Sequence, residues 1–156
     1  MKIKNLAYGA IIGAVYAALT IMLAPLSYGM IQVRVSEALC VLPMFTPAAI
    51  PGLFVGCLIA NLFYGNILDI VFGSFATLIA ALLTYKFRKK TFIAPIFPVL
   101  SNALIVGAYM FKLMGVEFSL GYYALSAFWV GLGELISCYG LGTWLIMYLK
   151  KHNIFK

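Results

Sequence analysis

The sequence predicts an all-α membrane protein with six transmembrane helices in a single integral membrane domain, residues 1–156. Three observations lead to this fold class. Of the 156 residues, 65% are hydrophobic and only 10% are charged, whereas soluble domains carry roughly 45–50% apolar and roughly 25% charged residues. Apolar stretches longer than about 18 residues recur, long enough to cross a hydrocarbon core about 30 Å thick. Prolines, glycines and one basic run separate these stretches.

The boundaries of the helices follow from turn residues and caps. Pro25 ends the first apolar run, because proline does not continue a helix. Thr46 is placed to cap the third helix and Pro47 to begin it, and Gly65 and Asn66 give a tight turn after it. In chain order the six predicted helices cover residues 5–24, 34–45, 47–64, 67–87, 92–112 and 120–149.

The placement of lysine and arginine predicts the orientation in the membrane. Six helices put both termini on the same side, and cytoplasmic loops near helix ends carry an excess of basic residues. With the N-terminus inside, only Arg34 and Lys112 fall outside. The sequence therefore predicts a protein of the cell membrane with both termini in the cytoplasm. The same placement accounts for the net charge of +7 without nucleic acid as a partner.

The residue patterns of catalytic and metal sites do not occur. Cys40, Cys57 and Cys138 stand alone, without the spacing of a metal site or a disulfide framework, and the single histidine, His152, lies in the basic C-terminal segment. The sequence contains no phosphate-binding loop for ATP. We therefore expect no metal, no cofactor and no enzymatic activity. Energy for uptake against a gradient would have to come from an ion or from another subunit.

The first predicted helix carries two neighbouring stripes of small residues. Residues spaced by four lie along one side of a helix, and small side chains let another backbone approach closely. The stripes serve either packing within the bundle or docking of a partner, and two stripes on the outermost helix favour a partner more than one would. They consist of Gly9, Gly13 and Ala17, and of Ala10, Ala14 and Ala18.

Carboxylates and amides inside apolar segments mark a candidate ligand site. An acidic side chain within a bilayer is costly, so it usually faces the bundle interior at a substrate or ion path. Amides and an aromatic ring beside such acids would hold a small polar ligand in a cavity that opens outward. The amides could instead join helices, and the tryptophan could anchor at the membrane interface. The candidates are Glu37, Asp69, Glu134, Asn61, Asn102 and Trp129.

Arg34 and Glu37 are the charged residues of the second predicted helix. Side chains three positions apart are neighbours on a helix, so the two can pair at the outer mouth and reduce each other's cost of partial burial. Two interpretations stay open. The pair either caps the helix, or Glu37 holds a ligand while Arg34 steadies Glu37.

Several motifs together resemble the QueT family of queuosine-precursor transporters. The similarity is most specific between Gln32 and Leu53, which contains RVSEAL, LP and FTPAAIPGL. The resemblance extends over nearly the whole chain. Further matching positions are Ile59, Ala60, Asn61, Asp69, the segment 73–81, Asn102, Ala103, Gly133 and Glu134.

The resemblance implies the six-helix fold of a substrate-binding S component of an energy-coupling-factor (ECF) transporter. It implies as partners a transmembrane T component, which meets the small-residue surface of the first helix, and two ATPase subunits. It also implies transport by toppling of the S component in the membrane. The implied ligand is a 7-deazaguanine, preQ1 (7-aminomethyl-7-deazaguanine) or queuine. The candidate residues named above would together make the hydrogen bonds, the ionic contact and the stacking contact with this ligand.

Three alternatives remain at this stage. The chain could be an S component for another vitamin or nucleobase. It could be a non-transporting membrane scaffold whose stripes only recruit partners, or an ion-coupled carrier that works alone.

Overall fold

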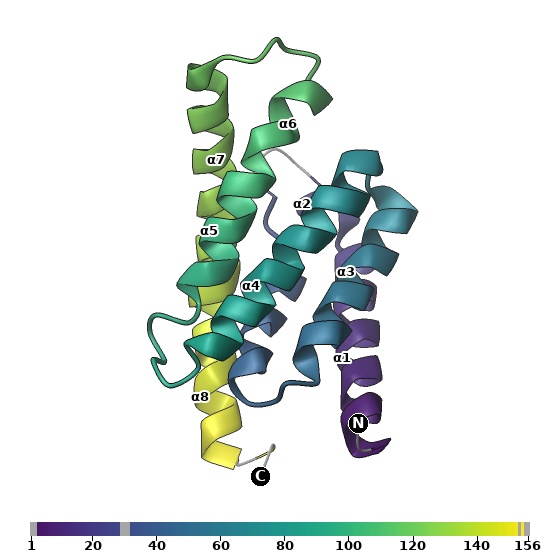
Figure 1. The fold of residues 1–156 in the computed structure, drawn as a ribbon, viewed down its shortest axis with the longest axis vertical. Helices are drawn as coiled ribbons and strands as arrows, with labels where there is room; N and C mark the ends of the chain where they lie inside the picture. Colours follow the sequence, from purple (N-terminus) through teal and green to yellow (C-terminus); the bar gives the residue numbers. More distant parts are fainter. Residues whose placement is uncertain (1–2, 29–31, 153, 155–156) are drawn as a thin grey trace.

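The structure is a computed structural model that describes residues 3–28, 32–152 and 154. Within these residues every regular element is a helix and no strand occurs. The helices lie side by side and form one elongated bundle (Figure 1). The predicted all-α class is therefore confirmed.

Each predicted helix corresponds to one helical element or to a run of consecutive elements. The last predicted helix, for example, is a run interrupted by a π-helical segment. In chain order the elements are α1 (Ile3–Met22), α2 (Ala24–Ser27), the 3-10 helix η1 (Val35–Met44), α3 (Ala49–Tyr64), the π-helix η2 (Asp69–Gly73), α4 (Ser74–Lys86), α5 (Ile96–Ile105), α6 (Gly107–Leu113), α7 (Leu120–Leu135), the π-helix η3 (Ile136–Leu141) and α8 (Gly142–His152).

Three helical stretches in the described residues are long and apolar enough to cross a membrane. Three further apolar helices are shorter than a full span, so the predicted number of six spans stays a prediction. The long stretches are Ile3–Met22, Asp69–Lys86 and Leu120–His152, and the shorter helices are Val35–Met44, Ala49–Tyr64 and Ile96–Met110.

The helices α1 and α3 pack with their backbones in direct contact. A Cβ atom added at Gly56 would lie 2.5 Å from the carbonyl oxygen of Gly13, and one added at Gly52 would lie 2.5 Å from that of Gly9. No side chain fits at such distances, so this close approach requires glycine on α3. Ala17 is buried as well. The first stripe of small residues therefore packs within the bundle, one of its two predicted uses.

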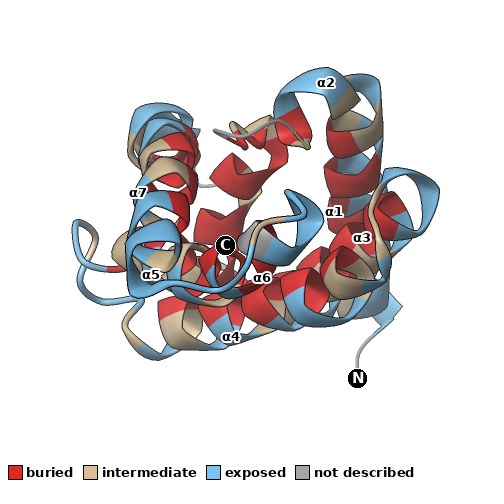
Figure 2. Cartoon of the chain, turned by 90° about the horizontal axis from the view of Figure 1, so that it is seen from above, coloured by how far each residue is buried: buried red, intermediate tan, exposed pale blue. Residues whose placement is uncertain are grey.

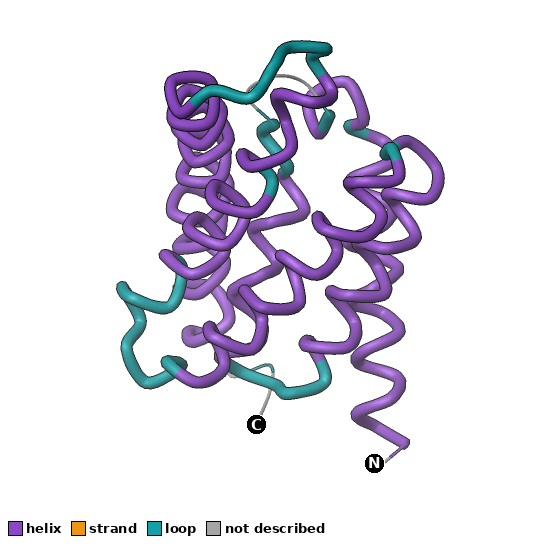
Figure 3. The backbone as a smooth tube through the Cα atoms, turned by 45° about the horizontal axis from the view of Figure 1, so that its top comes forward, coloured by secondary structure: helices purple, strands orange, loops and turns teal. Residues whose placement is uncertain are grey.

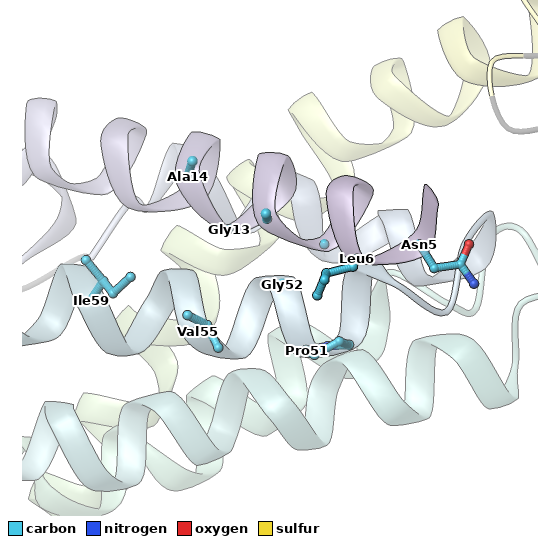
Figure 4. A pocket seen from close by; sticks show the side chains of 10 residues that line it. Asn5, Leu6, Gly13, Ala14, Pro51, Gly52, Val55 and Ile59 are labelled. Atoms are coloured by element: carbon cyan, nitrogen blue, oxygen red, sulfur yellow. The ribbon is translucent and has the colours of Figure 1, made fainter. Parts of the chain in front are cut away.

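The second stripe stays on the surface of the bundle. Ala10, Ala14 and Ala18 are all exposed. An apolar groove of about 420 Å³ lies between α1 and α3 and includes Ala10 and Ala14 in its lining, and Figure 4 shows the side chains that line it. In a membrane this surface is open to lipid or to another helix. The lining residues are Asn5, Leu6, Gly9, Ala10, Gly13, Ala14, Pro51, Gly52, Val55 and Ile59.

The second predicted segment is a 3-10 helix, not the expected α-helix. It packs against α1, α4, α8 and η3, and most of its residues are buried. Pro43 lies inside it, where in an α-helix the proline ring would clash with the carbonyl four residues earlier. A 3-10 helix also rises about 2.0 Å per residue, so these few residues reach further through the bundle than an α-helix of equal length.

The predicted cap of the third helix is wrong. The helix begins at Ala49 instead of Pro47, with Ala48 at its N-cap and no side-chain cap. The Thr46 hydroxyl accepts a hydrogen bond from the Ala48 N–H at 3.3 Å, and the Ala49 N–H donates to the Thr46 carbonyl at 3.2 Å. Thr46 thus closes a turn that precedes the helix.

The first turn of α1 and the last turn of α8 lie at the same end of the bundle (Figure 1). This agrees with the prediction that both termini share one side, whereas their cytoplasmic location stays a prediction. The opposite end, called the distal end below, carries α2, the turn that follows α3 and the loop between α6 and α7 (Figure 1). Figure 3 shows this last loop in teal at the top of the bundle. Viewed from the distal end, the buried faces of the helices point toward the centre of the bundle (Figure 2).

Candidate ligand-binding site

A cluster of polar side chains surrounds Asp69 at the distal end. The Oδ1 atom of Asp69 accepts a hydrogen bond of 2.7 Å from the Tyr109 hydroxyl and lies 4.0 Å from Nη2 of Arg34. Arg34 and Asp69 are only 2% and 3% exposed, so this ion pair is shielded from water. Nε of Arg34 donates to the Ser27 carbonyl at 3.2 Å, and the guanidinium lies 5.0 Å from the Tyr28 ring centroid. Nη2 of Arg34 has no hydrogen-bond partner among the described residues.

The turn after α3 positions Asp69. Oδ1 of Asn66 accepts hydrogen bonds from the N–H groups of Leu68 at 2.8 Å and Asp69 at 3.2 Å, the pattern by which asparagine stabilises a turn. The side-chain amide of Asn66 in return donates to Oδ2 of Asp69. Asp69 also begins the π-helix η2, and short π-helical segments are frequent at functional sites.

Asn61 links three elements behind this cluster. Its side-chain amide donates to the Asp69 carbonyl at 2.8 Å and to the Ser74 hydroxyl at 3.3 Å. Its Oδ1 accepts a hydrogen bond of 3.0 Å from the Tyr28 hydroxyl. Burial raises the pKa of Tyr28 to about 12, so this hydroxyl stays protonated and remains a donor at neutral pH. Asn61 therefore joins helices, as one of its two interpretations predicts, and holds the cluster in place.

A pocket of about 380 Å³ lies beside the cluster, within the range of roughly 300–1,000 Å³ that small-molecule sites occupy. Tyr28 and Tyr64 contribute aromatic surface, with ring centroids 6.4 Å apart, and α6 contributes apolar side chains. Gln32 has a φ of 46°, a conformation that is strained outside glycine and that clusters at ligand sites. The lining residues are Tyr28, Gln32, Tyr64, Gly65, Asn66, Asp69, Met110, Leu113 and Met114.

A second polar group lies deeper in the bundle, between α5 and α7. The side-chain amide of Asn102 donates to Oε1 of Glu134 at 2.9 Å, and each residue is 2% exposed. The Cys138 thiol lies 3.7 Å from Oε2 of Glu134 and 3.6 Å from the Glu37 carbonyl oxygen. Oδ1 of Asn102 has no hydrogen-bond partner in the part of the chain that the structure describes.

Glu37 is held by neutral donors. The Tyr16 hydroxyl donates to its Oε1, and the Cys40 thiol donates to its Oε2 at 2.9 Å. The predicted pairing of Glu37 with Arg34 is wrong, since the ionic partner of Arg34 is Asp69. Arg34 has extended backbone geometry at the N-cap of η1 (φ −88°, ψ 99°), so the two side chains do not share a helical face.

The structure places the predicted site residues in three groups. Trp129 belongs to none of them. It is half-buried on α7, its ring packs edge-on against Phe128 at 5.5 Å between centroids, and no hydrogen bond or ring contact within the described residues joins it to the polar groups. The three groups are Arg34, Asn61 and Asp69 at the distal end; Asn102 and Glu134 in the interior; and Glu37 on η1.

Sequence reasoning missed several members of these groups. Tyr109 lies seven positions after Asn102, hence on the same helix face, and this spacing could have identified it. Tyr16 interrupts a run of small and aliphatic residues, where a buried phenol needs a hydrogen-bond partner. The sequence around Cys138 predicts only a small buried hydrophobic residue, and nothing in it indicates a contact with Glu134.

These features define a class of protein. Long apolar helices place it in the membrane, and buried charged and amide groups beside a pocket are typical of membrane proteins that bind or conduct a polar solute. The chain belongs to the QueT transporter family, because the family model described as QueT transporter matches residues 6–151. The long apolar helices agree with this membership.

A curated relative agrees with this membership. The chain is 35% identical over 89 residues to a protein of Lactococcus lactis subsp. cremoris (strain MG1363) named Queuosine precursor transporter QueT. The aligned region covers 53% of this chain and 53% of that protein, so the match spans about half the length of the relative. No solved structure matches the chain.

Proposed function

We propose that the chain is the substrate-binding S component of an ECF transporter for a queuosine precursor, most simply preQ1 or queuine. The observation that carries this proposal is the pocket of about 380 Å³ at the distal end, beside the buried pair of Arg34 and Asp69. The name of the curated relative supports the choice of cargo. Membership in a transporter family also agrees with the expectation that the chain is not an enzyme.

The chemistry of this pocket suits a 7-deazaguanine. The Asp69 carboxylate lines the pocket and can accept hydrogen bonds from the ring N–H and exocyclic amino group. Arg34 does not line the pocket, but its Nη2 lies 4.0 Å from Oδ1 of Asp69 and is the nearby donor for the ring carbonyl. The rings of Tyr28 and Tyr64 can stack on a flat heterocycle. Stacking on Trp129, by contrast, has no support from the pocket, which it does not line.

The proposal sets the orientation of the protein in the membrane. The loop after α4 carries Arg88, Lys89 and Lys90, and it lies at the same end of the bundle as the first turn of α1 and the last turn of α8 (Figure 1). An excess of basic residues marks the cytoplasmic side. The distal end and its pocket then face outward, where an uptake protein meets its ligand.

The exposed stripe of Ala10, Ala14 and Ala18 is the proposed contact with the T component. The stripe borders an apolar groove along α1 and α3, and small residues allow a second membrane helix to approach closely. Two ATPase subunits would then supply the ATP hydrolysis for which this chain has no phosphate-binding loop.

Uptake of labelled preQ1 into cells that lack their own uptake system tests this assignment. We expect accumulation when the chain is expressed with the T component and both ATPases, and only background when it is expressed alone. Ala14→Trp should lower the uptake rate by about tenfold or more, because an indole on the stripe keeps a partner helix at a distance. Ligand binding by the isolated chain should change less than about twofold, since Ala14 is remote from the pocket.

Ala124→Trp is the matched control, because Ala124 is exposed on α7, away from the stripe. It should leave uptake unchanged. Accumulation by the chain without partners would instead indicate an ion-coupled carrier. Equal uptake by the Ala14→Trp and Ala124→Trp variants would mean that the stripe does not contact the T component.

A further inference from the structure

Buried charges in the described residues are unbalanced. Three carboxylates, those of Glu37, Asp69 and Glu134, are at most 3% exposed, whereas Arg34 is the one buried basic side chain. A buried charge is costly unless it is paired and hydrogen-bonded. The bundle therefore holds more acidic groups than its own cation can compensate.

The three carboxylates differ in how well they are partnered. Asp69 has the guanidinium of Arg34 and the hydroxyl of Tyr109. Glu37 receives a phenol and a thiol hydrogen bond. Glu134 receives one amide hydrogen bond, from Asn102 at 2.9 Å, and a distant thiol contact at 3.7 Å. Glu134 is thus the acid with the weakest compensation.

Asn102 adds an unused acceptor at the same place. Its Oδ1 is buried and has no hydrogen-bond partner among the described residues. When Glu134 is ionised, the NH₂ side of Asn102 must face it, because a carboxylate only accepts hydrogen bonds. Glu134 and Asn102 together therefore offer acceptors without a donor to match. A cationic donor such as an ammonium group is the complement of this arrangement.

This pair does not line the distal pocket but lies deeper in the bundle, below the level of Tyr109. Asn102 and Tyr109 are seven positions apart, and Val106 between them has helical backbone geometry, so they share one face two turns apart, about 10 Å along the axis. A small apolar cluster that contains Val106 and Val130 lies between the level of Asn102 and that of Asp69. A two-ring base with a one-carbon arm has a length suited to this separation.

We propose that Glu134, with Asn102, is the specificity determinant that selects a ligand with a cationic arm over a neutral ligand of the same shape. This inference rests on the proposed function, since it takes the ligand to be a 7-deazaguanine. The base occupies the level of Asp69 and Arg34. Its ammonium arm extends between the side chains of the apolar cluster, which move apart to admit it, and binds the Glu134 carboxylate and Oδ1 of Asn102.

The test compares two ligands of nearly equal shape, 7-aminomethyl- and 7-hydroxymethyl-7-deazaguanine, by calorimetry on the purified full chain. The parent should bind the amine about 30-fold or more tightly than the alcohol, as expected for hydrogen bonds between charged groups. Glu134→Gln should reduce this ratio to about threefold or less while the Kd of the alcohol changes less than about threefold. Asn102→Leu should reduce the ratio in the same direction and serves as the second variant if Glu134→Gln does not fold.

Glu117→Gln is the matched control, because Glu117 is exposed in the loop 114–119, and it should keep the parental ratio. A ratio that survives in Glu134→Gln, or equal weakening of both ligands, overturns the inference and leaves the proposed function standing. Failure of the folded parent to bind either deazaguanine overturns the proposed function, and this inference with it.

Discussion

Gly56→Ala is expected to lower the melting temperature of the detergent-purified protein by roughly 3–10 °C, because an overpacked contact costs about 1–3 kcal/mol and a chain of this size shifts by about 2–4 °C per kcal/mol. The added methyl group would lie 2.5 Å from the carbonyl oxygen of Gly13 and 3.0 Å from Cβ of Tyr16. Backbone atoms cannot rotate away, so α1 and α3 must separate. Movement of α1 would also displace Tyr16 from Glu37.

Gly140→Ala is the matched control for this substitution. Gly140 is exposed in η3, and an added Cβ would meet nothing within 4 Å. The exchange should leave the melting temperature within about 1–2 °C of the parent, since surface substitutions change stability by about 0.5 kcal/mol or less. Equal melting temperatures for Gly56→Ala and the parent would mean that α1 and α3 do not pack as described.

Arg34→Met is expected to be more destabilising, by about 3–5 kcal/mol, because it leaves the buried Asp69 carboxylate without a cation. The hydrogen bonds from Tyr109 and Asn66 remain, but they do not neutralise the charge. Chemical or thermal unfolding in detergent measures the loss. Arg88→Met is the control, because Arg88 is exposed in the basic loop and its removal should change stability by less than about 0.5 kcal/mol.

The double variant Arg34→Met, Asp69→Asn separates folding from binding. Removing both charges should recover most of the lost stability, as expected for two residues that interact directly. Binding of a deazaguanine should not recover, because the proposed donor and acceptor for the base are both absent. A double variant that binds like the parent would show that this pair has only a structural role.

Much of the fold could be predicted from hydrophobic runs and their boundaries. The six predicted segments correspond to the observed helical elements, and the turn at Gly65 and Asn66 forms where the sequence places it. The conformation of η1 could not be predicted, because tertiary packing inside the bundle decides between an α-helix and a 3-10 helix. The cap at Thr46 failed for a related reason, since capping residues also stabilise isolated turns.

The site was predictable in composition but not in pairing. Apolar surroundings identify Asp69, Asn102 and Glu134 as buried polar residues, because each would be costly in a membrane without a partner. Which partner each finds depends on contacts between distant segments, such as Tyr109 with Asp69, 40 positions apart. The expected pairing of Arg34 with Glu37 relied on local helical spacing, and the extended backbone at Arg34 removes that spacing.

The central claim is that this chain alone contains the binding site for a deazaguanine. Calorimetric titration of the detergent-purified chain with preQ1, queuine and guanine tests it most directly. The account predicts a 1:1 complex with preQ1 or queuine and binding of guanine weaker by about tenfold or more, since guanine lacks the arm that Glu134 and Asn102 are proposed to hold. A folded, monodisperse chain that binds none of the three would contradict the account.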